Sequence, residues 1–377
     1  MKVGIIGSGT MGIGIAQVAA TADCAVFLYD ANSVQTEKSL KNLKISLDKL
    51  AEKGKISAEK SLDIFSNIKP CLDLENLQDC DLVVEAIIEN KEIKTELFQN
   101  LEKIVSENCI LASNTSSISI TSLQANLQKP ERFIGIHFFN PAPILPLVEV
   151  IPGLLTNENL SAEMLELMNS WGKSPIVAKD VPGFIVNRIA RPFYGEALRI
   201  VEENLATPEQ VDDAMKSLGN FKMGPFELMD LIGIDINFSV TTMVYKDYFY
   251  DPKYKPSLLQ QRMSEAKLLG RKSGKGFYNY SEGAEKPSPK KDENLYQQIF
   301  MRIISMLINE AVEAKRLGIA SDEDIETAMQ KGVNYPKGLL SWGKEIGFSK
   351  ISETLQNLYT EYQEERYRQS PLLRKMN

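Results

Sequence analysis

Short β-branched runs alternate with amphipathic helical stretches from residue 1 to about residue 150. This alternation is typical of βα units, in which helices cover a mostly parallel sheet. Between the second and third runs, a segment from Ser33 to about Lys60 is rich in Lys, Leu and Glu, and we expect it to form one or two exposed helices inserted into the sheet domain. The predicted strands are Val3–Ile6, Ala25–Tyr29, Leu82–Ala86, Ile110–Ala112 and Phe133–Phe138.

Helical periodicity replaces this alternation after about Asp180, which predicts a separate all-helical domain. Ser281–Glu293 is charged and contains two prolines, so it is the best linker candidate in the chain. The helical stretches expected before this linker are Ile185–Glu203, Pro208–Leu218 and Pro225–Val244.

The segment after the linker repeats the helical pattern that precedes it. A shift of 114 positions aligns the two segments without a gap, and the matches span the whole pattern. We therefore expect a duplicated helical domain. The aligned identities are Arg188 with Arg302, Glu196-Ala197 with Glu310-Ala311, Ala214-Met215 with Ala328-Met329, Asn220 with Asn334, Gly224 with Gly338, and Ile232-Gly233 with Ile346-Gly347.

A glycine motif, Gly7-x-Gly9-x-x-Gly12, directly follows the first predicted strand and opens a helical stretch. Gly7 permits a tight turn, Gly9 lets the backbone approach a pyrophosphate, and Gly12 allows the helix to pack close to the strand. The pyrophosphate would then lie at the helix N-terminus, where free N–H groups and the helix dipole favour an anion. The motif alone is a weak signal, but the strand before it and the helix after it agree with dinucleotide binding.

An acidic residue, Asp30, closes the second predicted strand. A carboxylate there can accept hydrogen bonds from ribose hydroxyls and would repel a 2′-phosphate, so NAD is favoured over NADP. The expected fold class is α/β, with a Rossmann-type NAD-binding domain followed by a duplicated all-α domain. The expected boundaries are 1–184 for the NAD-binding domain, 185–280 for the first helical copy, 281–293 for the linker and 294–377 for the second copy.

The single histidine, His137, lies near the end of the fifth predicted strand. Active sites of Rossmann-type sheets collect beyond the C-terminal strand ends. Glu149 follows in another apolar run, close enough in sequence to orient an imidazole. Alcohol oxidation by NAD needs a base with a pKa near neutral, which suits histidine better than any other ordinary side chain. His137 and Glu149 are therefore candidates for the chemical site.

The composition and charge of the chain argue against several classes of binding partner. The net charge of −7 gives no electrostatic reason to expect nucleic acid or an anionic membrane surface. No apolar run approaches the roughly 18 residues of a membrane span, and the N-terminus lacks the pattern of a signal peptide. The four cysteines show no C-x-x-C pair, so we expect reduced thiols in a cytoplasmic protein and no metal site.

At this point the chain resembles the L-3-hydroxyacyl-CoA dehydrogenase family. The resemblance is specific over roughly residues 1–280 and looser over the repeat. The motifs that carry it are GSGTMGIGIA at the glycine loop, Leu82-Val-Val-Glu85-Ala, Ser113-Asn114-Thr115-Ser116-Ser117, HFFNP from His137, Leu147-Val-Glu149-Val150, Pro182 to Arg188 (PGFIVNR), Met223-Gly224-Pro225-Phe226, and Gly274-Lys-Gly276-Phe277-Tyr278.

The resemblance implies an enzyme of lipid metabolism that interconverts L-3-hydroxyacyl-CoA and 3-ketoacyl-CoA by hydride transfer to NAD. It implies that His137 is the general acid and base, that Glu149 pairs with it, and that Ser116 and Asn187 hydrogen-bond the substrate oxygens. Ser46 and Lys53 match positions that contact the CoA moiety. The implied cofactor contacts are Gly7, Gly9, Thr10, Met11, Gly12, Asp30, Glu85, Asn140 and Lys272.

Two other functions stay open at this stage. One is an NAD-dependent dehydrogenase of a free hydroxy acid, and the other is a non-enzymatic NAD-binding structural protein. Acyl chain length, pathway and oligomeric state are not decided by the sequence. The second helical copy has Met301 where the first has Asn187, while its packing positions are retained. We therefore expect Leu295–Asn377 to pack on Ile185–Tyr280 as an internal partner that stands in for the second subunit of a homodimer.

Overall fold

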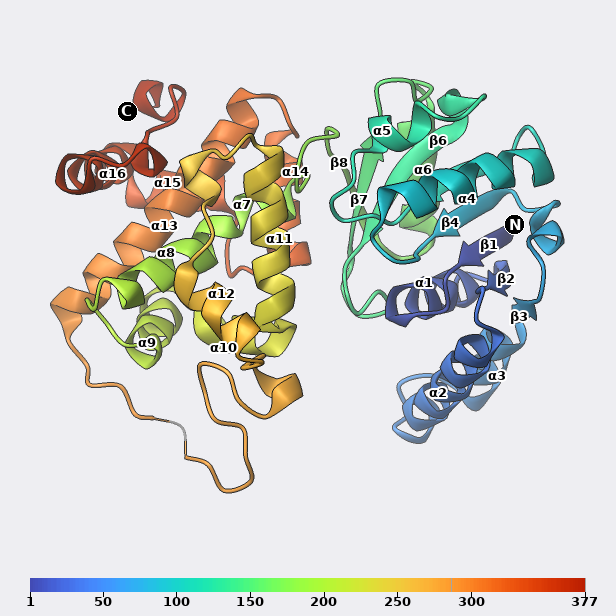
Figure 1. Cartoon of the computed structure of the whole chain (residues 1–377), viewed down its shortest axis with the longest axis horizontal. Helices are drawn as coiled ribbons and strands as arrows, with labels where there is room; N and C mark the ends of the chain where they lie inside the picture. The colour runs from blue at the N-terminus through green and yellow to red at the C-terminus, as the bar shows by residue number, and fades with distance from the viewer. Residues whose placement is uncertain (286, 377) are drawn as a thin grey trace. The chain divides into compact units, whose positions relative to one another are not determined.

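The computed structural model describes residues 1–285 and 287–376, so Lys286 of the expected linker and the C-terminal Asn377 lie outside the described residues. The chain divides into two compact units between Phe184 and Ile185 (Figure 1). The first unit is built on a sheet, and the second is helical.

The sheet of the first unit has eight strands in the order β3-β2-β1-β4-β5-β6-β7-β8. All neighbouring strands are parallel except β6 and β7, which are antiparallel. The carboxyl ends of β1, β2, β4, β5 and β6 therefore meet at one edge, where ligands bind in open α/β sheets. The strands are β1 (Lys2–Ile6), β2 (Ala25–Tyr29), β3 (Ile68–Cys71), β4 (Leu82–Glu85), β5 (Ile110–Ser113), β6 (Phe133–Phe138), β7 (Leu147–Pro152) and β8 (Ser174–Val177).

All five predicted strands are confirmed within one or two residues. Three further strands complete the sheet, and β3 and β8 escaped prediction because each has only four residues and contains a proline. The helices of this unit are α1 (Thr10–Thr21), α2 (Ser33–Glu52), α3 (Ala58–Ser66), α4 (Lys91–Ile104), α5 (Ile120–Gln124) and α6 (Leu160–Ser170). The short 3₁₀ turns are Leu74–Leu77 and Pro130–Arg132.

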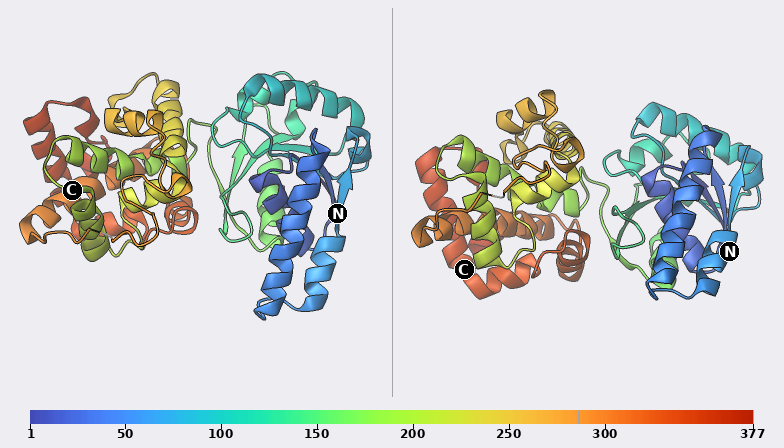
Figure 2. Two further views of the ribbon diagram at one scale, coloured as in Figure 1. Left: turned by 60° about the horizontal axis from the view of Figure 1, so that its bottom comes forward. Right: turned by 90° about the horizontal axis from the view of Figure 1, so that it is seen from below.

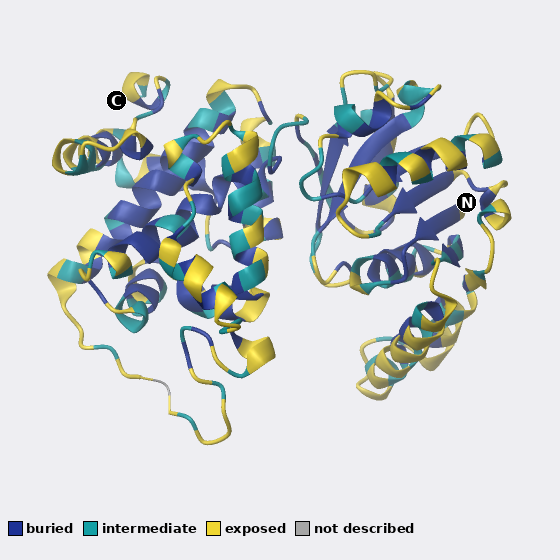
Figure 3. Cartoon of the chain, in the orientation of Figure 1, coloured by how far each residue is buried: buried dark blue, intermediate teal, exposed yellow. Residues whose placement is uncertain are grey.

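The predicted insertion forms two helices, α2 and α3, which project from the sheet as a hairpin (Figure 2). Asn32 and Ser57 cap their N-termini by accepting hydrogen bonds from Gln35 N and Lys60 N. Most of the hairpin surface is exposed, whereas the strands are buried (Figure 3).

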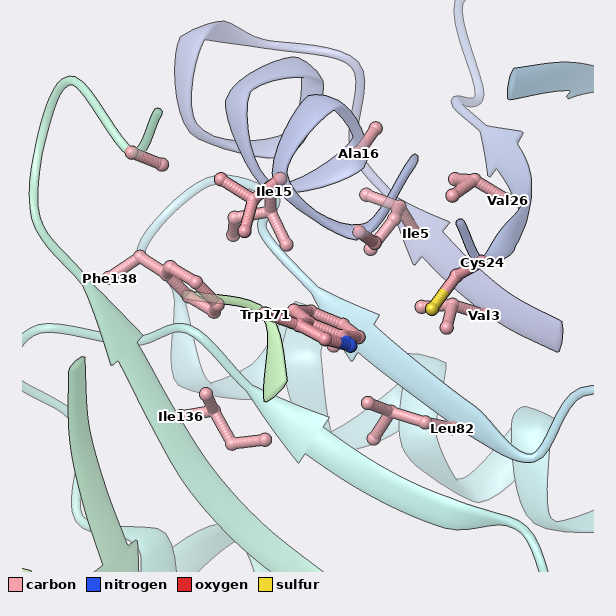
Figure 4. Packing of buried hydrophobic residues seen from close by; sticks show 14 of the residues in the cluster. Val3, Ile5, Ile15, Ala16, Cys24, Val26, Leu82, Ile136, Phe138 and Trp171 are labelled. Carbon is pink, nitrogen blue, oxygen red and sulfur yellow. The ribbon is translucent and has the colours of Figure 1, made fainter. Parts of the chain in front are cut away.

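The core of the first unit gathers around Trp171, which follows α6. Figure 4 shows Ile15 of α1, Val3 of β1, Leu82 of β4 and Ile136 of β6 around its indole ring. Because α1 and α6 contribute to one cluster, the core holds α1, and with it the glycine loop, firmly against the strand ends.

The second unit contains two runs of helices. The first is α7 (Val186–Ile189), α8 (Arg191–Glu202), α9 (Pro208–Gly219), α10 (Pro225–Ile232), α11 (Ile234–Asp247) and α12 (Leu258–Glu265), with 3₁₀ turns at Pro252–Tyr254 and Arg271–Ser273. The second is α13 (Glu293–Arg316), α14 (Asp322–Gly332), α15 (Leu339–Ile346) and α16 (Phe348–Tyr362), with 3₁₀ turns at Glu365–Tyr367 and Leu373–Lys375.

Two of the expected helical stretches are broken. Ile185–Glu203 breaks at Ala190, two residues before Pro192, which lacks the N–H that a continuous helix needs. Pro225–Val244 breaks at Gly233, whose φ of 105° lies outside the helical region. Among the described residues no single helix is long and apolar enough to span a membrane; the pair α10–α11, bent by 101°, meets the length and composition of a span.

The repeat is visible in the backbone. The starts of α9, α10 and α11 and of α14, α15 and α16 lie 114 positions apart. Asn220 and Asn334 share a left-handed φ, at 55° and 54°, and Gly233 and Gly347 share a positive φ, at 105° and 93°. The long helix α13 packs against α8 and α9 of the first copy.

Candidate functional site

The glycine loop joins β1 to α1, and each of its three glycines suits its position for a different physical reason. Gly7 has φ +99°, and a Cβ there would lie 2.5 Å from the carbonyl oxygen of Ala86. A Cβ on Gly12 would lie 1.7 Å from the carbonyl oxygen of Gly7. A Cβ on Gly9, in contrast, would meet nothing within 4 Å.

Gly9 is also the N-cap of α1, and no side chain caps this helix. The N–H groups of Thr10, Met11 and Gly12 in the first turn are therefore left for a ligand, and the helix dipole favours an anion there. The open space at Gly9 fits the pyrophosphate of a dinucleotide.

Asp30 follows β2 and holds the glycine loop. Its Oδ2 accepts hydrogen bonds from Ser8 N at 2.7 Å and Ser8 Oγ at 2.8 Å, and its Oδ1 accepts one from Asn32 N at 2.9 Å. A carboxylate has about four lone-pair sites, so Asp30 keeps capacity for one further donor such as a ribose hydroxyl.

His137 and Glu149 form a direct cross-strand pair. They face each other in the antiparallel register of β6 and β7, and His137 Nδ1 lies 2.7 Å from Glu149 Oε2. His137 is 6% exposed and Glu149 is fully buried. The rings of Phe139 and Phe184 lie 4.5 Å and 5.8 Å from the imidazole, centroid to centroid.

This pairing determines the chemistry open to the imidazole. A carboxylate accepts the Nδ1 proton, which fixes the neutral tautomer with its lone pair on Nε2. Nε2 has no hydrogen-bond partner within residues 1–285 and 287–376. The arrangement can therefore take up a proton at Nε2 and stabilise the resulting imidazolium through Glu149.

The Ser113–Ser117 loop after β5 is organised by Glu89, a residue that the sequence analysis missed. Glu89 Oε1 accepts hydrogen bonds from Thr115 Oγ1 at 2.6 Å, Ser117 Oγ at 2.7 Å and Ser116 N at 3.0 Å. Burial raises the pKa of Glu89, but Lys94 and these hydroxyl donors outweigh it, so the pKa is lowered overall. Glu89 therefore holds its charge and fixes the backbone of Ser116.

Glu85 lies below this loop, at the end of β4. Its carboxylate accepts hydrogen bonds from Lys94 Nζ at 2.5 Å, Ser113 Oγ at 2.6 Å and Ile87 N at 2.7 Å. Because Glu85 is fully buried, it supports the cofactor-side loops from beneath, whereas Glu89 reaches the surface. The sequence does contain one signal for Glu89. It precedes Asn90, which caps α4, so these two polar residues lie between a strand and a helix.

Asn114 connects this loop to the histidine strand. Its Oδ1 accepts a hydrogen bond from Phe138 N at 2.8 Å, so the Ser113–Ser117 loop and the end of β6 are held together. Asn140, just beyond β6, is exposed. Ser46 and Lys53 are both exposed, at seven positions' separation along α2 and its C-cap, which is about two helical turns and hence one face.

The remaining predicted residues belong to the second unit. Asn187 lies half-buried on α7, and its backbone carbonyl accepts a hydrogen bond from Arg191 Nε at 2.7 Å. Lys272 is exposed and forms an ion pair with Asp235, 2.6 Å from Nζ to Oδ1. The first unit thus brings together the glycine loop, Asp30, Ser116, His137 and Glu149; the catalytic and binding roles of all these residues stay predictions.

Comparison with known proteins decides the family. Residues 2–181 match the model of the 3-hydroxyacyl-CoA dehydrogenase NAD-binding domain, and residues 183–280 and 299–377 match the model of the C-terminal domain of the same family. The chain belongs to the 3-hydroxyacyl-CoA dehydrogenase family. It is an NAD-dependent oxidoreductase, and the second match falls on the repeat.

A curated relative and a solved structure, both from Escherichia coli K12, match nearly the whole length of this dehydrogenase. The 3-hydroxyadipyl-CoA dehydrogenase of Escherichia coli (strain K12) is 36% identical over 99% of this chain and 96% of its own. The crystal structure of 3-hydroxybutyryl-CoA dehydrogenase from Escherichia coli K12 has a TM-score of 0.95 at 36% identity, covering 100% of this chain and 98% of that one.

A shorter relative matches about three quarters of this chain. The crystal structure of (S)-3-hydroxybutyryl-CoA dehydrogenase from Ralstonia eutropha is 42% identical with a TM-score of 0.72, and covers 74% of this dehydrogenase and 99% of its own chain. The chains similar to this dehydrogenase therefore differ in length.

Proposed function

We propose that this chain interconverts L-3-hydroxyacyl-CoA and 3-ketoacyl-CoA with NAD, using His137 as the general acid and base. The observation that carries the proposal is the His137–Glu149 pair at the edge of the sheet where the glycine loop and Asp30 also lie. A buried imidazole with one nitrogen fixed by a carboxylate and the other open is what proton exchange with an alcohol requires.

The mechanism assigns one task to each residue. NAD, when bound at the glycine loop, supplies the hydride acceptor. His137 Nε2 removes the proton of the 3-hydroxyl group, and Glu149 stabilises the imidazolium through Nδ1. Ser116 and Asn187 donate hydrogen bonds to the substrate oxygen and orient C3 for transfer. In the reducing direction, protonated His137 returns the proton to that oxygen.

His137→Ala tests the proposal directly. We expect kcat to fall by about 10²-fold or more, the usual contribution of general acid–base catalysis, while the dissociation constant of NADH stays within about threefold, because the glycine loop is untouched. An active His137→Ala enzyme would remove the proposal.

Glu149→Gln tests the pairing separately. The chain has one histidine, so ¹⁵N NMR of labelled imidazole reports its tautomer without assignment. We expect a loss of the fixed Nδ1–H tautomer together with a lower kcat. A kcat unchanged by Glu149→Gln would mean that the carboxylate does not support proton transfer at His137.

The substrate form is tested by rate comparison. Free hydroxy acids share the hydride chemistry, so initial rates with a 3-hydroxyacyl-CoA and with the corresponding free acid separate the two classes of dehydrogenase. We expect the thioester to be preferred, because exposed Ser46 on α2 and Lys53 at its C-cap offer polar contacts to CoA. A rate with neither substrate would favour a non-enzymatic NAD-binding protein.

We also propose that the second helical copy is an internal partner of the first. Support comes from two reciprocal ion pairs. Arg188 Nε of the first copy lies 2.6 Å from Glu310 Oε1 of the second, and Arg302 Nε of the second lies 3.0 Å from Glu196 Oε2 of the first. A contact in which i meets j′ and j meets i′ is the pattern of a two-fold symmetric dimer interface.

A further inference from the structure

The loop between β6 and β7, residues 139–146, joins the two strands that carry His137 and Glu149. It is longer than the roughly 2–5 residues of most hairpin connections. The antiparallel register fixes the ends of this loop, so contacts from other elements must place its middle. Asn140, which is predicted to contact NAD, lies exposed in the loop. Whatever holds the loop therefore decides where Asn140 lies beside His137.

A buried lysine outside the predicted site holds the middle of this loop. Lys173 lies between α6 and β8 and is 9% exposed. Its Nζ donates hydrogen bonds to the backbone oxygens of Ala142 and Leu145, the second at 3.1 Å. The next residue, Ser174, donates its N–H to the backbone oxygen of Pro146 at 2.7 Å. Two consecutive residues thus hold three carbonyl groups of the loop.

Lys173 differs from the other buried lysine of the first unit in its partners. Lysines are almost never fully buried unless they are paired, and Lys94 pairs with Glu85 and Glu89. Lys173 forms no ion pair with a carboxylate within residues 1–285 and 287–376, and burial lowers its pKa. An aliphatic side chain would avoid this desolvation but would leave the loop carbonyls without a donor. The amine is therefore explained by the carbonyls that it holds.

The core of the first unit fixes the backbone of Lys173. The N–H of Lys173 donates to the backbone oxygen of Met168 in α6 at 3.0 Å, and Gly172 turns the chain with a φ of 73°. Trp171, two positions before Lys173, belongs to the core cluster (Figure 4). A flexible side chain thus starts from a rigid point, so its amine can hold the loop in place.

The same loop also packs against α1, the helix that follows the glycine loop. A Cβ on Gly14 of α1 would lie 3.3 Å from Ala142 Cβ and 3.3 Å from Pro143 Cδ, so an alanine there would need the loop to shift by a few tenths of an ångström. Ala142 is 1% exposed and belongs to the same core cluster as Ile15 of α1. Its methyl group thus contacts the cofactor helix, while its carbonyl oxygen accepts from Lys173.

We propose that Lys173 is a positioning residue that, together with Gly14, sets the place of Asn140 relative to His137 and α1. Lys173 touches no reacting atom and acts through Ala142. The inference rests on the proposed function, because it takes His137 as the group that exchanges the proton and Asn140 as a contact of NAD. Hydride transfer is sensitive to such placement, since a displacement of about 1 Å caused by a remote change can cost about 10²-fold in rate.

Two substitutions in the full-length enzyme displace the loop by different physical means. Lys173→Met removes the donor to both carbonyls. Gly14→Ala keeps that donor and adds a methyl group against Ala142, and it should not weaken α1, because alanine favours a helix interior over glycine. We expect both variants to lower the single-turnover rate of NADH oxidation by about tenfold or more when the enzyme–NADH complex is mixed with acetoacetyl-CoA. The dissociation constant of NADH should stay within about threefold, because the pyrophosphate and ribose contacts are unchanged.

Leu77→Ala is the control for a loss of stability in the same unit. Leu77 is fully buried in the 3₁₀ turn before β4, which packs against α4 and β2. This variant should lower the midpoint of urea unfolding at least as far as Lys173→Met does and leave the single-turnover rate unchanged. An equal loss of rate in Leu77→Ala, an unchanged rate in Lys173→Met, or a loss in Lys173→Met without one in Gly14→Ala would overturn the positioning role and leave the proposed function standing. Absence of turnover in the unaltered enzyme would instead remove the proposed function and this inference with it.

Discussion

The two helical copies share a backbone and differ in chemistry. Both begin their second, third and fourth helices at equivalent positions, and both turn through a left-handed asparagine and a glycine of positive φ. The first copy breaks its first helix into α7 and α8, whereas the second runs unbroken through α13. The difference follows from Pro192, which aligns with Met306.

A helix cap shows what both copies keep. Asp212 accepts hydrogen bonds from Phe226 N and Glu227 N at the start of α10. Glu326, at the equivalent position, accepts them from Leu340 N and Ser341 N at the start of α15. A Cβ on Gly224 or Gly338 would collide with these carboxylates, so the glycines are retained with the cap. The second copy therefore keeps the backbone architecture of the first but not the predicted polar site residue, since Met301 stands in place of Asn187.

The largest effect is expected from removal of the second helical copy. A chain ending near Gly283 would expose the face of α8 and α9 that α13 covers. We expect it to aggregate or to form a homodimer through this face, as measured by light scattering during size-exclusion chromatography. A truncated chain that stays monomeric, soluble and fully active would show that the second copy is not an internal partner.

The two reciprocal ion pairs should contribute unequally to the free energy of unfolding. Glu310→Gln leaves Arg188 buried without its carboxylate, and breaking a buried pair costs about 3–5 kcal/mol. Glu196→Gln should cost less, because Arg302 keeps Glu203, whose Oε2 lies 2.8 Å from Nη1. Urea unfolding of both variants measures the difference. If Glu196→Gln lowers the free energy of unfolding more than Glu310→Gln does, the reciprocal ion pairs are not the main contribution of these arginines to stability.

Aligned positions in the two copies should separate catalysis from packing. Asn187→Ala should lower kcat/KM by about 10–100-fold if its side chain donates to the substrate oxygen. Met301→Ala, the matched substitution in the second copy, should lower stability by about 1–3 kcal/mol and leave kcat/KM unchanged. Equal effects on activity would indicate that Asn187 is a packing residue like its counterpart.

The sequence predicted well those elements whose chemistry is local. The glycine loop, five strands and the helical repeat each have a pattern that a short window reveals. The short strands β3 and β8 and the breaks at Ala190 and Gly233 depend on tertiary pairing and packing, so periodicity missed them.

The same distinction between local pattern and tertiary contact applies to the candidate site. The pairing of His137 with Glu149 follows from the antiparallel register of β6 and β7, which spacing alone could only suggest. Glu89 was missed because its partners, Thr115 to Ser117, lie more than 25 residues away in sequence.

The last prediction concerns the pH dependence of the cap that both copies share. Burial raises the pKa of Asp212 to about 7, although Phe226 N, Tyr278 Oη and Glu227 N oppose the shift by hydrogen bonding. Between about pH 4 and pH 7 the folded state then binds more protons than the unfolded state. The free energy of unfolding should therefore fall as pH rises through this window, by at most about 1.4 kcal/mol per pH unit for one proton.

Asp212→Asn removes this titration and should make the fall with pH shallower between pH 5 and pH 7. Trp342 lies in the helical unit and Trp171 in the other, so urea unfolding followed by fluorescence in a Trp171→Phe background reports the unit that contains Asp212. Glu326→Gln is the matched substitution at the half-buried cap of the second copy. If Asp212→Asn leaves the slope as steep as in the Trp171→Phe parent, Asp212 is ionised throughout the range, and the two caps differ only in the length of their side chains.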